Sequence, residues 1–174
     1  MHIFLQGPRG IGKSTVITKT LEIIQEGSPL SIGGFYTWRG GKGDPNIYMR
    51  SADPGNPKAA YRLATWDDSQ GRLICDNRAF DRDGARLLGE RLGADLIIMD
   101  ELGFLESKAH VFIRAVYDTL SGDIPVFGVL RQGEIPWQTQ IAIDPRVLIY
   151  NVDEQNRDAL PKELAKNLLR SMGR

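Results

Sequence analysis

The sequence is poor in the residues that form disulfides and metal clusters. It contains one cysteine, Cys75, so no disulfide can form within the chain. Its two histidines, His2 and His110, lie far apart, and no Cys/His group has the spacing of a zinc site. We therefore expect Cys75 to be a small buried apolar residue, and we expect neither histidine to take part in chemistry.

An excess of one charge and a long apolar run are both missing. Lys plus Arg and Asp plus Glu each number 22, whereas nucleic-acid-binding proteins usually carry a basic excess. The balance argues weakly against a nucleic-acid role and leaves a local basic patch open, so we predict no clear nucleic-acid partner. No apolar run approaches the roughly 20 residues that span a bilayer, and the amino-terminal segment lacks the basic start of a signal peptide. We predict a cytoplasmic protein without a membrane partner. The sequence leaves the oligomeric state open.

The remaining composition is that of a globular protein. With 174 residues, of which 41% are hydrophobic, the chain is long enough to bury a core, and we predict one domain over residues 1–174. Apolar runs and turn signals predict strands at 2–6, 31–39, 46–50, 61–66, 94–102, 125–131 and 147–152. Helical spacing of apolar residues predicts helices at 13–26, 81–92, 107–121 and from Pro161 onward, with a loop over 131–146.

This order of elements predicts an α/β fold. Strands that alternate with helices form a parallel sheet with helices on both faces. The segment between residues 31 and 66 breaks the alternation, so we expect it to extend one edge as an antiparallel hairpin.

The strongest motif follows the first strand. Residues 7–14 read Gly-Pro-Arg-Gly-Ile-Gly-Lys-Ser and fit the phosphate-binding pattern G-x-x-x-x-G-K-[ST] in full. Glycines let backbone N–H groups wrap a phosphate, and the following helix directs its positive end at the anion. We predict that Lys13 contacts the β- and γ-phosphates and that Ser14 ligates Mg²⁺. The nucleotide-binding residues predicted here are Gly7, Pro8, Arg9, Gly10, Ile11, Gly12, Lys13, Ser14 and Thr15. The alternative is a glycine turn that binds nothing, and the predicted strand and helix around the motif argue against it.

A second motif ends the strand at 94–102. Asp100 and Glu101 follow the apolar run Leu-Ile-Ile-Met. We predict that Asp100 holds the magnesium ion and that Glu101 polarises an attacking water. Two acids that merely end a strand are the alternative. Adjacent acids favour hydrolysis, because a hydrolase must activate water. By analogy with related folds, they also predict that another strand lies between the Asp100 strand and the first strand.

Other basic residues are weaker candidates. Arg131 ends the strand at 125–131, where an arginine could stabilise the charge of a transition state, and Arg9 projects from the phosphate-binding motif. Arg39 ends another strand. Each of these arginines could instead be solvated.

The segment Asn156-Arg157 could flank the base or the ribose of a nucleotide. It could equally be a helix-capping segment, because Asp158 lies shortly before Pro161.

With these motifs in place, the sequence resembles the small nucleoside-triphosphatases first described from a thermophile, whose human member is the cancer-related nucleoside-triphosphatase. The resemblance rests on blocks at 7–15, 33–37, 96–106 and 151–164. It implies a RecA-like P-loop fold and slow hydrolysis of several nucleoside triphosphates to diphosphate and phosphate. It also supports the roles given to Lys13, Ser14, Asp100 and Glu101, and it implies that Gly103 lets the backbone approach the γ-phosphate.

Two other functions compete with hydrolysis. One is a P-loop nucleoside or nucleotide kinase, although the loop at 131–146 has only Arg131 and Arg146 to serve as an arginine-rich lid. The other is a nucleotide-dependent switch with little turnover, in which Trp66 or Trp137 would belong to an interface.

Overall fold

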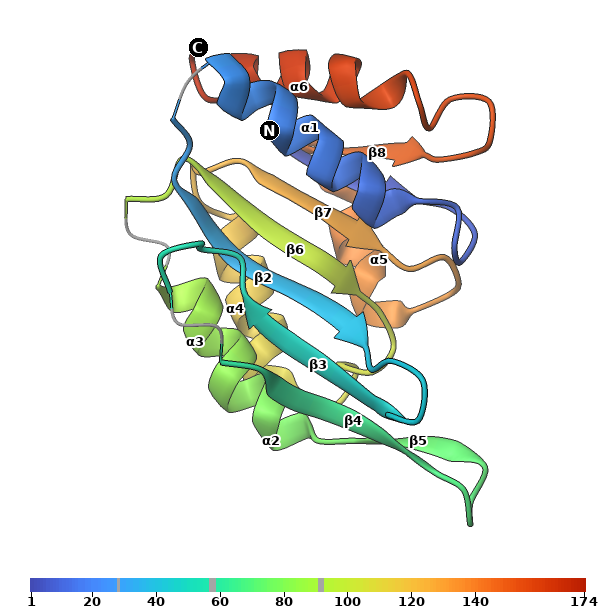
Figure 1. The fold of residues 1–174 in the computed structure, drawn as a ribbon. Helices are drawn as coiled ribbons and strands as arrows, with labels where there is room; N and C mark the ends of the chain where they lie inside the picture. The colour runs from blue at the N-terminus through green and yellow to red at the C-terminus, as the bar shows by residue number, and fades with distance from the viewer. Residues whose placement is uncertain (28, 57–58, 91–92) are drawn as a thin grey trace.

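A single eight-stranded sheet organises the chain. The computed structural model describes residues 1–27, 29–56, 59–90 and 93–174. Its strands are β1 (His2–Gln6), β2 (Ile32–Arg39), β3 (Asn46–Ser51), β4 (Tyr61–Asp67), β5 (Arg72–Cys75), β6 (Leu96–Leu102), β7 (Val126–Leu130) and β8 (Val147–Asn151). They lie in the order β5-β4-β3-β2-β6-β7-β1-β8 (Figure 1).

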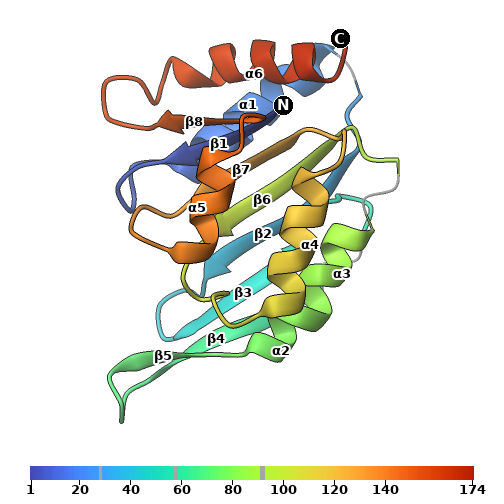
Figure 2. The same cartoon turned by 180° about the vertical axis from the view of Figure 1, so that it is seen from behind.

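Helices cover both faces of this sheet. They are α1 (Lys13–Gly27), α2 (Asn77–Ala79), α3 (Ala85–Gly89), α4 (His110–Leu120), α5 (Pro136–Ile143) and α6 (Leu160–Ser171), and a π-helical segment, η1 (Phe80–Gly84), joins α2 to α3. Helices α1 and α6 lie on one face, whereas α3, α4 and α5 lie on the other (Figures 1 and 2). The predicted α/β fold with helices on both faces is therefore confirmed.

The strand directions divide the sheet into two parts. Strands β2, β6, β7, β1 and β8 pair in parallel, whereas β2–β3, β3–β4 and β4–β5 pair antiparallel. This arrangement confirms the antiparallel extension predicted between residues 31 and 66. It also confirms the predicted intervening strand, because β7 lies between β1 and β6.

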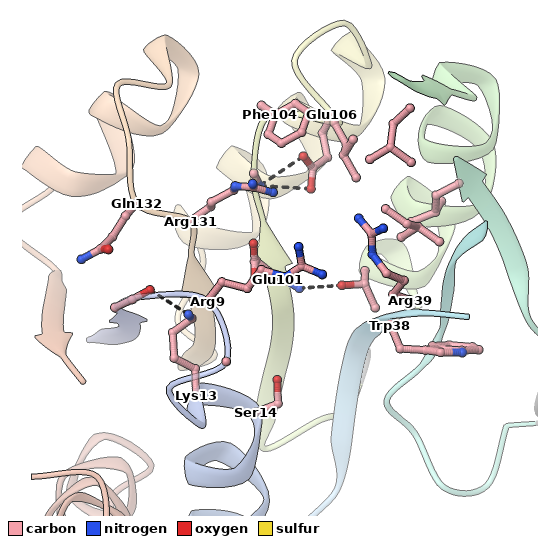
Figure 3. A pocket seen from close by; sticks show the side chains of 18 of the residues that line it. Arg9, Lys13, Ser14, Trp38, Arg39, Glu101, Phe104, Glu106, Arg131 and Gln132 are labelled. Carbon is pink, nitrogen blue, oxygen red and sulfur yellow. Dashed lines mark hydrogen bonds between the residues drawn. The ribbon is translucent and has the colours of Figure 1, made fainter. Parts of the chain in front are cut away.

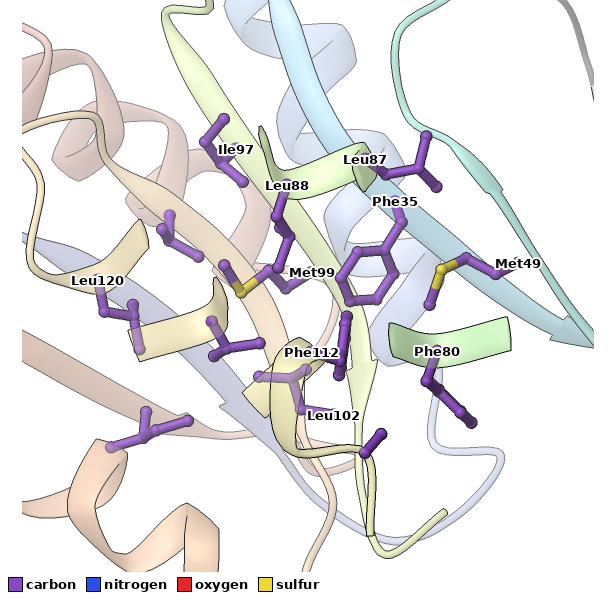
Figure 4. Packing of buried hydrophobic residues seen from close by; sticks show 14 of the residues in the cluster. Phe35, Met49, Phe80, Leu87, Leu88, Ile97, Met99, Leu102, Phe112 and Leu120 are labelled. Atoms are coloured by element: carbon purple, nitrogen blue, oxygen red, sulfur yellow. The ribbon is translucent and has the colours of Figure 1, made fainter. Parts of the chain in front are cut away.

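The alternating side chains of the strands form two cores. In β1, Ile3 and Leu5 pack on the α1/α6 face, while Phe4 packs on the opposite face. The second core centres on Phe112 of α4, whose ring lies 5.6 Å from that of Phe35 and 5.5 Å from that of Phe80 (Figure 4). Phe80 thereby connects this core to the end of the sheet where the site lies.

The helix predicted at 81–92 is wrong in its start and in its regularity. A carboxylate oxygen of Asp76 accepts the Ala79 backbone N–H at 3.1 Å, so helical structure already begins at Asn77. The π-helical segment then brings Gly84 against Phe112, where a Cβ atom would lie 2.7 Å from the ring. The apolar spacing used for the prediction contains no signal for that insertion, and its Leu92 lies outside the described residues.

Two short elements were missed. The predicted loop at 131–146 contains α5, which starts with Pro136 in its first turn and buries only Gln138 and Ile141, so its sequence shows no apolar stripe. Strand β5 has four residues, which is too few for alternation to be recognised. Helix α4 begins at His110, so the predicted start at residue 107 is wrong.

Cys75 is less buried than predicted, and the two histidines lie at the starts of β1 and α4. His110 is exposed at the start of α4, whereas Cys75 is half-buried at the end of β5, and burial raises the pKa of its thiol. His2 is buried, its Nε2–H donates to the carbonyl of Leu120 at 3.0 Å, and its Nδ1 accepts the N–H of Val126 at 3.1 Å. Among the described residues, no helix is long and apolar enough to cross a membrane.

We predict that His2 makes the protein less stable in mild acid. Burial, together with the nearby amino-terminal charge, lowers its pKa from 6.5 to about 4. As the pH falls, His2 therefore binds a proton in the unfolded chain before it does so in the folded protein. The free energy of unfolding should be about 2 kcal/mol lower at pH ~5 than above pH ~6.5. Urea unfolding at both pH values measures this loss. The His110→Gln variant should lose the same stability between the two pH values as the wild type. The same loss in the His2→Gln variant would contradict the assignment.

Candidate functional site

A cavity of about 590 Å³ lies at the carboxyl ends of the parallel strands. Parallel strands end at one edge, so the segments that follow β1, β6, β7 and β2 meet there. The cavity brings together ten of the predicted site residues: Gly7, Arg9, Gly10, Gly12, Lys13, Ser14, Thr15, Glu101, Gly103 and Arg131. Five others are not among the residues that line it: Pro8, Ile11, Asp100, Asn156 and Arg157.

The segment after β1 forms the loop that the phosphate-binding motif predicts. Gly7 has a φ of 149°, and a Cβ there would lie 2.5 Å from the carbonyl oxygen of Val152, so only glycine fits. Gly12, directly before α1, has a φ of 107°. The Lys13 ammonium donates to the carbonyls of Gly7 at 2.8 Å and Pro8 at 3.0 Å, which holds the loop closed (Figure 3). A triphosphate would offer this ammonium stronger, charged acceptors.

Asp100 is buried behind the cavity wall. Its carboxylate is hydrogen-bonded to Ser14, the second residue of α1. Burial raises the pKa of Asp100 to about 6, although the hydrogen bond with Ser14 and the charge of Lys13 act against this rise. A buried carboxylate beside a hydroxyl at a helix start offers the oxygen ligands that Mg²⁺ prefers.

The rest of a magnesium shell would come from the substrate. Among the described residues, no group of three or more His, Cys, Asp or Glu side chains could hold a metal ion. A metal ion held by Asp100 and Ser14 would therefore need further ligands from water or a bound phosphate.

Glu101 faces the cavity one residue further on. It is half-buried, and its backbone N–H donates to the Thr37 hydroxyl at 3.0 Å, which ties the end of β6 to β2 (Figure 3). Glu101 and Ser14 both line the cavity, whereas Asp100 does not. A water near Glu101 would have a proton acceptor next to the phosphate loop.

The turn after Glu101 is held from two sides. Both oxygens of the buried Glu106 carboxylate accept the N–H of Gly103, at 3.2 and 3.1 Å. The indole N–H of Trp137 donates to the Gly103 carbonyl at 3.0 Å, so Trp137 helps to hold this turn in place. Burial raises the pKa of Glu106 to about 7, against the effect of its backbone hydrogen bonds.

Glu106 is a site residue that the sequence does not predict. The residue lies in the 96–106 block, but nothing in its spacing distinguishes it from a surface glutamate three residues after a glycine. Only the fold shows that it is buried and lines the cavity.

Three arginines reach into the cavity from different segments. They are Arg9 in the phosphate loop, Arg39 at the end of β2 and Arg131 after β7 (Figure 3). The guanidinium of Arg131 stacks over the ring of Phe104 at 4.5 Å, which orients it above the turn. The side chains of Arg9 and Arg39 have no hydrogen bond or ion pair with any residue in the described ranges, so both guanidinium groups are available to an anion.

Asn156 and Arg157 lie on the other side of β1, in the loop after β8. The Asn156 side chain donates to the Asn151 carbonyl at 2.8 Å and accepts the Asp153 N–H at 3.0 Å, so it shapes this loop. Arg157 is exposed and donates a long bond of 3.5 Å to the carbonyl of Ile11, beside the phosphate loop. The loop therefore lies where a nucleoside could extend from the phosphates.

The capping alternative for Asp158 is wrong. Helix α6 begins at Leu160 without a side-chain cap. Asp158 instead lies 3.7 Å from the ammonium of Lys19, and both side chains are largely exposed.

Known proteins resemble the chain over nearly its full length. The sequence profile of a family described as NTPase matches residues 2–165. The nucleoside-triphosphatase THEP1 of Methanosarcina acetivorans is 30% identical, over 99% of each chain. The human cancer-related nucleoside-triphosphatase is 26% identical, over 91% of this chain and 92% of the relative.

Two solved structures share the fold. The crystal structure of THEP1 from Aquifex aeolicus aligns with a TM-score of 0.78 at 17% identity, over 97% of this chain and 99% of its own. The solution structure of the human cancer-related nucleoside triphosphatase gives a TM-score of 0.77 at 22% identity, over 98% of each chain. Both support a P-loop NTPase fold for the sheet and its helices.

Proposed function

The chain belongs to the NTPase family and is a nucleoside-triphosphatase, and we propose that it hydrolyses ATP, GTP and other nucleoside triphosphates slowly, with Mg²⁺, to diphosphate and phosphate. The observation that carries this proposal is the position of Glu101 inside the cavity, between the phosphate loop and the turn at Gly103. In this proposal residues 1–174 act as one domain in the cytoplasm.

In this proposal the phosphates lie along the loop after β1. Its backbone N–H groups and the start of α1 favour an anion, and Lys13 would exchange its carbonyl partners for the β- and γ-phosphate oxygens. Ser14 and Asp100 would hold Mg²⁺, which when bound neutralises charge on those phosphates. Asn156 and Arg157 would flank the nucleoside on the far side of β1.

Hydrolysis would then take place beside Glu101. The carboxylate of Glu101 orients a water and takes its proton as the water oxygen bonds to the γ-phosphorus. The bond to the bridging oxygen breaks, and its electron pair leaves with the nucleoside diphosphate. Arg131, fixed over Phe104, would balance charge that develops on the γ-phosphoryl group. Gly103 leaves room for that group, because it carries no side chain.

The structure gives the kinase alternative little support. The segment at 131–146 forms the short helix α5. Of its two arginines, Arg146 is bound to Asp144 at 2.7 Å. Only Arg131 lines the cavity, so the described part of this segment offers no arginine-rich lid.

We predict that Ser14→Ala and Asp100→Asn each raise the Mg²⁺ concentration needed for half-maximal hydrolysis. Each variant removes one oxygen from the proposed coordination shell. Phosphate release titrated with MgCl₂ measures the shift, with Thr18→Ala as the control, since the Thr18 hydroxyl only donates to the Ser14 carbonyl on the exposed side of α1. Unchanged titrations in both variants would place the metal elsewhere.

Glu101→Gln tests the function itself. The change keeps the size and hydrogen bonding of the side chain but removes the proton acceptor, so phosphate release should fall by about 10²–10⁴-fold. Binding of ATP should stay near that of the wild type, because Lys13, Ser14 and Asp100 are unchanged. Single-turnover phosphate release without any acceptor, paired with calorimetry, separates the two effects.

Glu134→Gln is the matched control for that experiment. Glu134 is an exposed glutamate at the same edge of the sheet, outside the cavity lining. Its variant should release phosphate as the wild type does. Release by Glu101→Gln at the wild-type rate would refute the water-activating role.

A further inference from the structure

The cavity extends beyond the part that a triphosphate needs. Along the sheet, the loop after β8 lies on one side of β1, and β7, β6 and β2 to β5 lie on the other. If the nucleoside points toward β8, as proposed above, the γ-phosphate points toward Glu101 and the antiparallel extension. The extension still contributes Ile47, Leu63 and Leu73 to the cavity, one residue from each of three strands.

This end of the cavity is an apolar chamber. We use that term for the space lined by Ile47, Leu63, Leu73, Phe80 and Leu105. Leu63 and Phe80 are fully buried beneath the chamber, and the half-buried Ile47, Leu73 and Leu105 provide its accessible apolar surface. Neither a phosphate nor an attacking water gains from such a lining, since apolar walls favour an apolar ligand.

A positively charged side chain, that of Arg39, lies at the opening of the chamber. Arg39 is exposed and reaches into the cavity (Figure 3), and its side chain has no hydrogen-bonding or ionic partner among the described residues. Its guanidinium presents several donors in a plane, which suits a carboxylate or a phosphate. The chamber and its mouth therefore match a ligand with two parts, an apolar body and an anionic head.

We propose that this chamber binds a second small molecule, an aromatic or similarly compact apolar anion, next to the γ-phosphate of the bound nucleotide. Its ring packs among Ile47, Leu73 and Leu105, and its carboxylate or phosphate pairs with Arg39. Because the molecule occupies the approach to Glu101, it excludes the attacking water and slows hydrolysis. The inference rests on the proposed nucleotide orientation, which places the γ-phosphate beside Glu101.

Calorimetry with simple probes tests the site. Protein saturated with Mg²⁺ and a non-hydrolysable ATP analogue is titrated with benzoate and phenyl phosphate, and with acetate and inorganic phosphate as anions without a ring. At least one aromatic probe should bind with a Kd below about 1 mM and at least about tenfold tighter than its ringless partner. The stronger of the two aromatic probes identifies the anionic head that Arg39 prefers. Aromatic probes that bind no tighter than the ringless anions would overturn the proposal.

Paired variants locate the binding. Arg39→Gln should weaken binding of the aromatic probe about tenfold or more. Arg62→Gln should not, because Arg62 is an exposed strand arginine outside this cavity. Leu73→Ser should also weaken binding of the probe. Ile74→Ser should leave binding unchanged, because Ile74 is the next residue of β5 and lies outside the cavity lining. Equal effects within both pairs would place the probe elsewhere and overturn the proposal.

Failure of this inference is distinguishable from failure of the proposed function. Phosphate release from ATP alone, without any probe, tests hydrolysis and does not involve the chamber. Probe binding to the saturated protein is measured without turnover. Hydrolysis that proceeds unaffected by a saturating aromatic probe would show that the chamber does not control access to Glu101.

Discussion

Parallel pairing of β2, β6, β7 and β1 is the constraint on which the site depends. It directs the four carboxyl ends to one edge, so that residues about 90 positions apart in the sequence, Lys13 and Glu101, line the same cavity. The fully buried β1 residues Ile3, Phe4 and Leu5 anchor the phosphate loop between two cores. A shift of one residue in this pairing would turn each buried side chain to the opposite face, so the register that builds the core also positions the loop.

Glu101 is placed by backbone contacts on both sides of it. Thr37 accepts its N–H, and the turn that follows is tied to Glu106 and Trp137 through the two polar groups of Gly103. These bonds connect β6 to β2 and to α5, which fixes a carboxylate that would otherwise end a strand freely. The chemistry thus falls to a few side chains, and their precise position depends on the hydrogen bonds of neighbouring residues.

Much of this arrangement could be predicted from the sequence, because the main signals are local. The glycine pattern at residues 7–14 and the apolar run before Asp100 predict a loop and a strand end wherever the rest of the chain lies. Alternation with helices predicts the parallel sheet. The contributions of Glu106 and Trp137 could not be predicted, since they follow from long-range packing. Helix α5 and the π-helical segment also escaped prediction because they lack an apolar period.

Affinities of Lys13→Ala for ATP and AMP test the central claim, that the loop after β1 holds the β- and γ-phosphates. The lysine would meet those two groups alone, so calorimetry should show ATP binding weakened about ten- to a hundredfold, as expected for lost bonds to charged groups. AMP binding should change little, which also shows that the loop stays folded without the bonds of Lys13 to Gly7 and Pro8. Equal losses for ATP and AMP would contradict the account.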